Sequence, residues 1–433
     1  MVQPGDATGV YVNPSALAGL SGFSFIIGTN AIQDARSFSR APNDIDGDGV
    51  TDDIDDDQNP DVFETADNTA GPFPSPHAFV AYNFASLGLP NLTIGTGIWG
   101  PPRADLVLDK RGSQRYSTIA SYNVQAHYAL SAAYELPWKK LRLGFSAMGI
   151  TQIIDTQLAL NVPTACAGRL EDVTCDVRVS VVSSQHAIPM GTLAMSMELM
   201  KGLSFMASYQ LPYTFDTKGE ADLEIGFGVS DLASIEGRDI SVTGDMPGVA
   251  KTAIRYSEEQ WNVELAATWE NWSIHQEITF DANQIIVKPN EGVSVPGIDS
   301  DAGQSIGTIT LSPKLQDAYS FRLGGEYVAM EDLLLVRAGT YYETGAAQNK
   351  FLNMGNYDSD KIGLTVGAKV TVPGGLWLDL AAGYVYYSPI EVTDSESLFD
   401  DPLKEELGHP IGNGKYTNQQ IIMMAAIGGQ WGQ

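Results

Sequence analysis

Apolar and polar residues alternate with a period of two along most of the chain. In the segment 316–330, tyrosine, phenylalanine and leucine occupy one face of an extended strand, and serine, arginine and glutamate occupy the other. The segment 376–387 repeats this pattern. An apolar face suits lipid and a polar face suits a water-filled lumen, so the alternation predicts strands that cross a membrane.

Similar segments recur from one end of the chain to the other. They predict about 14 strands, an even number as single-chain bacterial barrels have, near residues 22–34, 76–87, 91–101, 121–136, 140–158, 187–200, 203–217, 248–258, 261–278, 316–329, 332–344, 360–372, 375–391 and 419–431. The turns between them alternate short and long, which is the sidedness of outer-membrane barrels. We therefore predict an all-β, antiparallel transmembrane barrel. Its long, outward-facing loops would be 35–72, 102–118, 160–186, 218–246, 280–315, 345–358 and 392–417.

Composition supports a barrel and excludes some partners. Hydrophobic residues make up 43% of the 433 residues, but no apolar run reaches the roughly 18 residues that a transmembrane helix needs. Only helices and closed barrels satisfy the backbone inside lipid, so a membrane protein of this kind must be a barrel. The net charge of −28 argues against binding to nucleic acid.

The acidic run in the first long loop, 35–72, predicts a calcium site. Its aspartates fall at the ligand positions of a calcium loop, with Gly49 at the sharp turn. The run resembles the Asp-rich repeat of thrombospondin type 3 modules, although Asp55 stands where an EF-hand has its bidentate glutamate. The alternative is an acidic loop without metal. The predicted ligands are Asp44, Asp46, Asp48, the Val50 carbonyl, Asp52 and Asp55, with Asp57 and Asn59 beginning an overlapping site.

The two cysteines, Cys166 and Cys175, lie close together in the polar loop 160–186. In an exported protein they predict one disulfide that closes a short loop, and the alternative is two free thiols. The chain begins Met-Val-Gln-Pro-Gly-Asp, without the charged and apolar regions of a signal peptide. Because an outer-membrane protein needs such a peptide, we expect this sequence to be a mature form or to be truncated at the start.

Several motifs resemble those of the long-chain fatty-acid transporter (FadL) family. The segment Asp6–Leu17, DATGVYVNPSAL, resembles the signature near the family's mature N-terminus; Asn13 and Pro14 carry it, and Ser15 replaces the usual alanine. Further matches follow in the family's order and cover most of the chain. They are YQLPYTFDTKGEA at 209–221, WNVELAATWENWS at 261–273, an Asp-Ala-Tyr hairpin at 317–339 and Gly-Lys-Tyr at 414–416.

This resemblance implies a fourteen-stranded barrel at 22–433, plugged by an N-terminal hatch at 1–21 that is shorter than the family's. In the family, a kink in the third strand opens the wall, and hydrophobic ligands leave the lumen sideways into the membrane. The corresponding opening here would lie where the third predicted strand runs into prolines, which remove hydrogen-bond donors. The alternative is that these prolines only end the strand. The residues concerned are Trp99, Gly100, Pro101 and Pro102.

Two arginines fall on the lumen-facing side of their strands. Arg322 and Arg337 are candidates to hold a ligand carboxylate, and the alternative is that they pair with other interior charges. The five histidines show no metal-binding spacing, and neither a Gly-x-Ser-x-Gly elbow nor a phosphate loop occurs. We therefore expect that the protein is not an enzyme.

The sequence favours passive uptake of hydrophobic small molecules, such as long-chain fatty acids or aromatic hydrocarbons. The protein would be a multi-pass barrel in the outer membrane of a Gram-negative bacterium, with calcium as a structural cofactor. Its partners would be the ligand, membrane lipid, lipopolysaccharide and proteins that contact the long loops. One alternative is a structural barrel that anchors a calcium-dependent surface or envelope complex, and another is an outer-membrane hydrolase.

Overall fold

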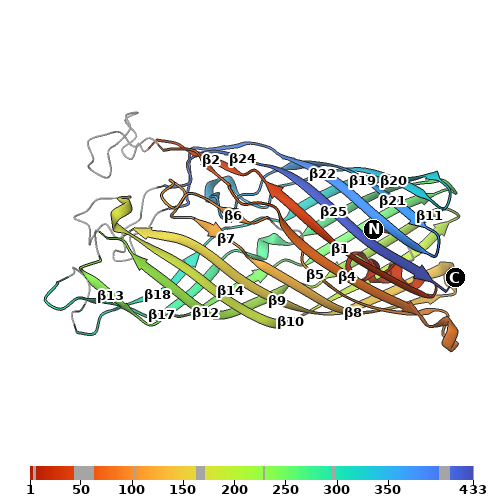
Figure 1. The fold of residues 1–433 in the computed structure, drawn as a ribbon, viewed down its shortest axis with the longest axis horizontal. Coiled ribbons are helices and arrows are strands. Elements are labelled where there is room, and N and C mark those ends of the chain that lie inside the picture. Colours follow the sequence, from red (N-terminus) through yellow and green to blue (C-terminus); the bar gives the residue numbers. More distant parts are fainter. Residues whose placement is uncertain are drawn as a thin grey trace.

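The chain folds into one closed antiparallel barrel (Figure 1), as predicted. The structure is a computed structural model that describes residues 1–2, 6–42, 63–101, 104–161, 171–227, 230–294, 299, 301–398 and 410–432. The barrel closes because the first strand, β1 (Phe23–Asp34), pairs with the last, β25 (Gln419–Trp431), along its whole length.

Fourteen strand lines make up the wall, the number predicted from the alternation. Four of these lines consist of two consecutive strands separated by a short break. In order around the wall they are β1, β4 (Phe73–Asn83), β5 (Leu92–Trp99), β8 (Val124–Leu136), β9 (Leu141–Asn161), β10 (Asp176–Met200), β11 (Leu203–Gln210) with β12 (Tyr213–Ile225), β14 (Asp239–Met246) with β15 (Val249–Ser257), β16 (Trp261–Glu270) with β17 (Ile278–Pro289), β18 (Gln304–Leu311) with β19 (Ala318–Met330), β20 (Leu334–Glu343), β21 (Lys361–Val372), β22 (Leu376–Tyr387) and β25.

The two ends of the barrel differ as the loop lengths predict. Short turns gather at one end, where both termini also lie, and long connections gather at the other (Figure 1). At the short-turn end, Trp431 stacks on Phe23 and Phe25 with ring centroids 6.0 and 5.7 Å away, as aromatic residues do at a membrane interface. Among the described residues, no helix has the length and apolar character to cross a membrane.

One side of the wall continues far beyond the expected strands. We call it the tall wall: the loop-end parts of β9 and β10, together with β12, β14, β17 and β18. β9 and β10 have 21 and 25 residues. The predicted loop 160–186 is therefore too wide, because β9 ends at Asn161 and β10 begins at Asp176. The predicted loops 218–246 and 280–315 likewise contain strands, including β13 (Ala233–Glu236).

The tall wall escaped prediction because its alternation is inverted. On β12, Asp216, Lys218 and Glu220 are exposed on the outside, whereas Phe215 and Ala221 are buried inside. An outer face rich in charge meets water rather than lipid, so the segment looks like a polar loop when only lipid-facing strands are sought. The barrel therefore buries apolar side chains in its interior beyond the lipid-facing band.

A small second sheet closes part of the loop end. It consists of β2 (Ser37–Arg40), β3 (Ala66–Asp67), β23 (Ile390–Val392) and β24 (Gly414–Thr417). We call this sheet and its hydrophobic core the cap. The core residues are Phe38, Ala66, Leu106, Leu108, Ala347, Leu352, Met354, Tyr357, Val392 and Tyr416.

The remaining elements are short. They are α1 (Gly9–Val12), η1 (Pro14–Gly19), η2 (Phe84–Leu87), β6 (Leu106–Val107), β7 (Ala120–Ser121), η3 (Trp138–Lys140), η5 (Val173–Cys175), η6 (Trp272–Ile274) and η7 (Asn349–Phe351). Two of them, α1 and η1, lie inside the barrel at the short-turn end, and we call this pair the hatch (Figure 1).

Candidate transport path

A continuous apolar track runs inside the barrel, along the side that carries the tall wall. It begins at the loop end with Ile240 and Phe280, passes Ile150 on β9, and ends at Trp99 on β5 and at Leu17 of the hatch itself. All five side chains belong to one cluster of buried, mutually packed residues. A nonpolar molecule moving along this track would stay out of water over most of the barrel's length.

The loop end of the track contains an apolar cavity of about 160 Å³. Lysine, arginine and histidine are all missing from the described residues that line it. An apolar cavity of roughly 150 Å³ stays dry and can hold a ligand the size of benzene. The lining residues are Tyr116, Leu158, Ala159, Leu160, Val179, Val181, Ala221, Leu223, Ile240, Phe280, Ala282, Ile285, Ile306, Ile309, Thr310, Leu311 and Leu398.

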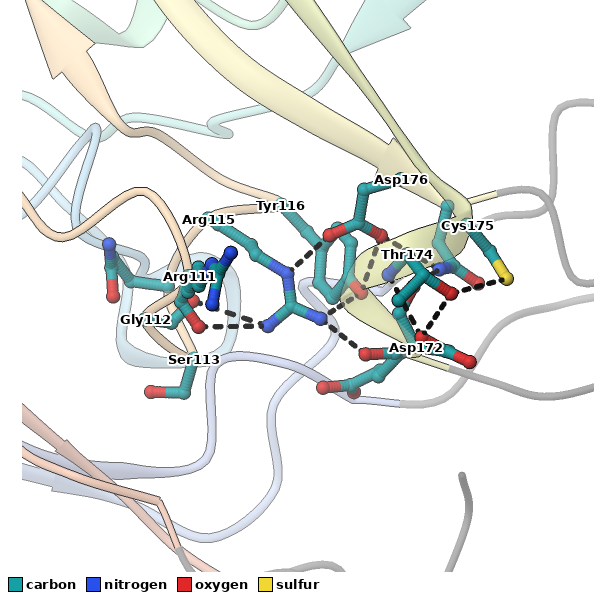
Figure 2. Close-up of polar contacts among 12 residues, drawn as sticks. Arg111, Gly112, Ser113, Arg115, Tyr116, Asp172, Thr174, Cys175 and Asp176 are labelled. Carbon is teal, nitrogen blue, oxygen red and sulfur yellow. Dashed lines mark hydrogen bonds and ion pairs between the residues drawn. The ribbon is translucent and has the colours of Figure 1, made fainter. Parts of the chain in front are cut away.

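A buried polar network fixes one wall of this cavity (Figure 2). The Arg115 guanidinium donates from Nε to Asp176 Oδ2 at 2.6 Å, and the Tyr116 hydroxyl donates to Asp176 Oδ1 at 3.1 Å. Asn161 donates to the same Asp176 oxygen at 2.7 Å. Burial raises the pKa of Tyr116 well above its ordinary value, although the Arg115 charge works in the opposite direction. The network therefore holds the Tyr116 ring, neutral, against the cavity.

Polar contacts hold the hatch against the wall, and a glycine in the wall allows it to approach closely. Asn13 caps η1, with its side chain accepting from Ser15 N at 3.1 Å, and Pro14 occupies the first helical position. Ser15 Oγ lies 3.0 Å from Ser196 Oγ on β10. A Cβ on Gly144 of β9 would lie 2.2 Å from Ser15 N, so η1 can only approach because that position is glycine.

Replacing Gly144 by alanine should therefore displace the hatch. The new methyl group would overlap the backbone of η1, and overpacking of this kind costs about 1–3 kcal/mol. We expect amide hydrogen exchange across α1 and η1 to accelerate about tenfold or more, since about 1.4 kcal/mol corresponds to a factor of ten. The matched control is Gly324→Ala, where the nearest atom is 3.6 Å from the new Cβ. Equal exchange in the two variants would contradict this account of the hatch.

Aromatic rings gather where the hatch meets the end of β5. The Trp99 ring lies 5.4 Å from Tyr11 of the hatch, 5.8 Å from Phe79 and 5.3 Å from His127, measured between centroids. Trp99 pairs with His77 of β4 and with His127 of β8, and it is the last residue of β5. The apolar track thus ends against an aromatic cluster at the edge of the third wall strand.

The wall is discontinuous beyond Trp99. β4 and β8 both continue past the residues that pair with Trp99, whereas β5 stops there and β6 pairs with β7 instead. Gly100 N donates to Pro76 O at 3.4 Å, and the Pro101 carbonyl accepts from Ser75 Oγ at 3.4 Å. Pro102 lies outside the described residues, and the opening predicted at Trp99, Gly100, Pro101 and Pro102 stays a prediction.

The two candidate arginines lie inside the barrel, as their position on the strands predicts. Arg337 is held by Glu326 at 2.7 Å and by Asp379 at 2.7 Å. Arg322 faces Glu343 at 3.3 Å, and 41% of its side chain is exposed. Both arginines therefore have interior partners. A role for either in binding a ligand carboxylate stays a prediction.

Two other predicted features fall outside the described residues. All of the proposed calcium ligands lie between 43 and 62, and Cys166 lies between 162 and 170. Cys175 is buried and is not a free thiol, but its pairing with Cys166 stays a prediction. Within the described ranges, His, Cys, Asp and Glu form no cluster of three or more that suits a metal ion.

Comparison with known proteins identifies the family. The sequence model described as "Outer membrane protein transport protein (OMPP1/FadL/TodX)" matches residues 113–417. The chain belongs to this family. The FadL/TodX family consists of transport proteins of the outer membrane, as the resemblance implied, and not of enzymes. No curated protein sequence matches the chain significantly.

Solved structures of FadL/TodX proteins have the same fold. A FadL homologue from Pseudomonas aeruginosa superposes with a TM-score of 0.77 at 14% identity, over 99% of this chain and 95% of that one. The Ralstonia pickettii toluene transporter TbuX gives 0.66 at 15% identity, over 100% and 96%. The Pseudomonas putida toluene transporter TodX gives 0.66 at 13% identity, over 99% and 95%. At these identities the likeness establishes the fold alone.

Sequence reasoning missed the residues that line the cavity of this FadL/TodX-family barrel. Ala221, Ile240 and Phe280 all lie in segments that were expected to be loops. The signal was present, because a charged residue occupies every second position from 216 to 224. A search for polar-out, apolar-in strands next to the lipid-facing ones would have found it. Gly144, which lets the hatch approach β9, carries no such signal, because only the fold shows that η1 lies opposite it.

Proposed function

We propose that this barrel carries hydrophobic small molecules passively across the outer membrane along the apolar track. The observation that supports the proposal is the unbroken series of buried apolar residues from the loop-end cavity to the hatch. A ligand entering the cavity would gain about 25 cal/mol for each Å² of apolar surface that leaves water. That gain needs no energy source, which suits a membrane without its own supply of ATP. Membrane lipid and lipopolysaccharide would surround the barrel as its further partners.

Uptake by cells tests this proposal. Cells that lack their own hydrophobic-compound transporter would express the full chain and receive radiolabelled toluene or palmitate. We expect the chain to raise the initial uptake of at least one of the two several-fold over cells carrying an empty vector, with saturation at high concentration. Uptake of both compounds at the vector level, with the folded barrel present in the outer membrane, would refute the proposal.

We further propose that the ligand leaves sideways, where β5 ends. Support comes from the position of Trp99, which is both the end of the apolar track and the last residue of β5. Beyond it, Gly100 offers no side chain to fill the space between the neighbouring strands. A Cβ on Gly100 would lie 3.3 Å from Gln125 O and 3.9 Å from Ser75 Cβ. A large side chain at position 100 would therefore stand between the two neighbouring strands.

The substitution Gly100→Trp tests lateral release. We expect it to abolish uptake while ligand still binds in the loop-end cavity, as measured by isothermal titration with the purified barrel. Val80→Trp is the control, because Val80 faces lipid on the neighbouring strand and is 40% exposed. Normal uptake by the Gly100 variant would place the exit elsewhere.

The first loop suggests calcium binding, and we propose it on the sequence pattern of Asp44 to Asn59. Extracellular calcium modules bind weakly, with Kd on the order of 10⁻⁴–10⁻³ M. Calorimetry should therefore show heat at millimolar Ca²⁺ with the purified protein, and Asp46→Ala should remove it. No heat from either protein would rule out the site. It would also remove the basis for the alternative role as a calcium-dependent anchor.

A further inference from the structure

Two buried polar atoms lie beside the apolar track, close to Trp99. They are Nδ1 of His127 on β8 and Oε1 of Gln152 on β9. Neither atom has a hydrogen-bond partner in the part of the chain that the structure describes, although the two residues are only 8% and 5% exposed. Buried polar atoms are nearly always paired, because an unpaired one destabilises the fold. An apolar track alone does not account for these two atoms.

The strand register places the two side chains on one patch of the inner surface. His127 of β8 pairs with Ile150 of β9. Gln152 lies two residues further along β9, so it is the diagonal neighbour of His127 on the same face of the wall. Diagonal neighbours have Cα atoms roughly 7–8 Å apart, within reach of long side chains. On β9, Ile150 and Ile154 flank Gln152, and both belong to the buried cluster that forms the track. A molecule that follows the track therefore passes both polar atoms.

Both unpaired atoms are hydrogen-bond acceptors. His127 Nε2 lies 3.4 Å from Gln125 Oε1, and because that oxygen can only accept, Nε2 carries the ring proton. In the neutral imidazole the other nitrogen, Nδ1, is then an acceptor. The Gln152 atom is an amide carbonyl oxygen, which also only accepts. A partner for this patch must therefore donate a hydrogen bond, which neither a hydrocarbon nor an ionised carboxylate can do.

Aromatic rings border the patch on the side of the proposed exit. The His127 ring stacks on Trp99 with an interplanar angle of 27°, and Trp99 in turn contacts Tyr11 and Phe79. Flat rings pack well against such a cluster. The loop-end cavity, at about 160 Å³, has the size of a single benzene ring, and its described lining includes no cation. These surroundings favour a small neutral aromatic molecule over a long or charged one.

We propose that His127 and Gln152 form a hydrogen-bonding subsite for small aromatic molecules that carry a hydroxyl group, such as phenols. The hydroxyl donates to His127 Nδ1 or to Gln152 Oε1 while the ring packs beside Trp99. A phenol hydroxyl, like that of tyrosine, has a pKa of about 10, so the molecule enters the apolar cavity uncharged at neutral pH. This inference rests on the proposed transport function and names the class of ligand that the track prefers.

Binding of two ligands of matched size tests the subsite. p-Cresol and p-xylene differ only in that a hydroxyl group in one replaces a methyl group in the other. Titration calorimetry of the full chain in lipid nanodiscs, corrected with empty nanodiscs, gives the Kd of each. We expect the double variant His127→Phe, Gln152→Met to reduce the preference for p-cresol, measured as the ratio of the two Kd values, about tenfold relative to the wild type. A factor of ten corresponds to about 1.4 kcal/mol, which is the contribution of roughly one hydrogen bond.

The matched control is His186→Phe. His186 is exposed on β10, beside Thr151, and not buried along the track, so this variant should keep the wild-type ratio. Heat-modified migration on a gel shows that each variant has folded. A folded double variant with the wild-type ratio would overturn the subsite and leave the transport function standing. If the wild-type barrel bound neither ligand, the proposed transport function would be contradicted together with the subsite.

Nuclear magnetic resonance tests where the hydroxyl binds. In the barrel with nitrogen-15-labelled histidine, the Nδ1 resonance of His127 is identified by its loss in His127→Phe. It should shift when p-cresol is added and stay in place when p-xylene is added, because only p-cresol donates a hydrogen bond. An equal shift with both ligands would show that ring packing alone moves the resonance, and it would also overturn the proposal.

Discussion

Replacing Ile240 by aspartate should reduce uptake of a hydrophobic ligand by about a hundredfold. Ile240 is 7% exposed and lines the loop-end cavity, where the described residues offer no cation. A carboxylate there must bring water with it or remain unpaired, and stripping its hydration to admit an oily ligand costs several kcal/mol. Each factor of ten in affinity corresponds to about 1.4 kcal/mol, so a penalty near 3 kcal/mol gives the expected loss. Initial uptake rates in whole cells measure it.

The neighbouring residue provides the control for this variant. Ser241 lies next in β14, points to the outside of the tall wall, and pairs with Lys218. Ser241→Asp therefore introduces the same charge on the same strand, but in contact with water. We expect its uptake to stay within about twofold of the wild type, because exposed charges change energies little. Equal uptake by the two variants would show that ligands do not pass through the cavity.

Replacing Arg115 by methionine should unfold the loop-end part of the tall wall locally. The change leaves Asp176, which is 6% exposed, as a buried carboxylate without its cation. Breaking a buried pair from one side costs about 3–5 kcal/mol. Amide hydrogen exchange at the ends of β9 and β10 should therefore accelerate by two to three orders of magnitude, since about 1.4 kcal/mol is a factor of ten. The membrane-spanning parts of the same strands should exchange as before.

An exposed ion pair on β10, the strand that carries Asp176, provides the control for the Arg115 variant. Arg178 pairs with Glu224 on the outside of the tall wall, where the two side chains are 36% and 68% exposed. Arg178→Met should cost only about 0–1 kcal/mol, because such surface pairs contribute little. If both arginine variants exchanged equally fast, burial would not be what makes the Arg115 pair important.

The sequence was sufficient for the membrane-spanning barrel. Alternation with a lipid-facing apolar side is a local property, so strands such as β19 and β22 can be recognised one by one, and their number follows. The alternation of short and long turns correctly predicted which connections lie at each end of the barrel. The hatch signature at Asn13 and Pro14 also marked a segment that the structure places inside the barrel.

The rest depends on contacts between distant segments. The alternation of β12 is as regular as that of β19, but its sign is reversed, and only the fold shows that its apolar side lines a cavity. The cap unites residues as far apart as Phe38, Tyr357 and Tyr416, and no local pattern links them. The pairing of Arg337 with Glu326 and Asp379 likewise requires the register between strands, which the sequence does not show.

The tall wall separates two selective pressures that most membrane strands must satisfy together. On a membrane-spanning strand, the residues next to each lumen-facing position face lipid. Changes inside the barrel are therefore constrained by insertion and folding in the membrane. The residues that line the loop-end cavity sit on strands whose outer side meets only water. Ligand preference can therefore drift, or be redesigned, by exchanging inward-facing residues of β12, β14 and β17, while the part that anchors the protein in the bilayer stays untouched.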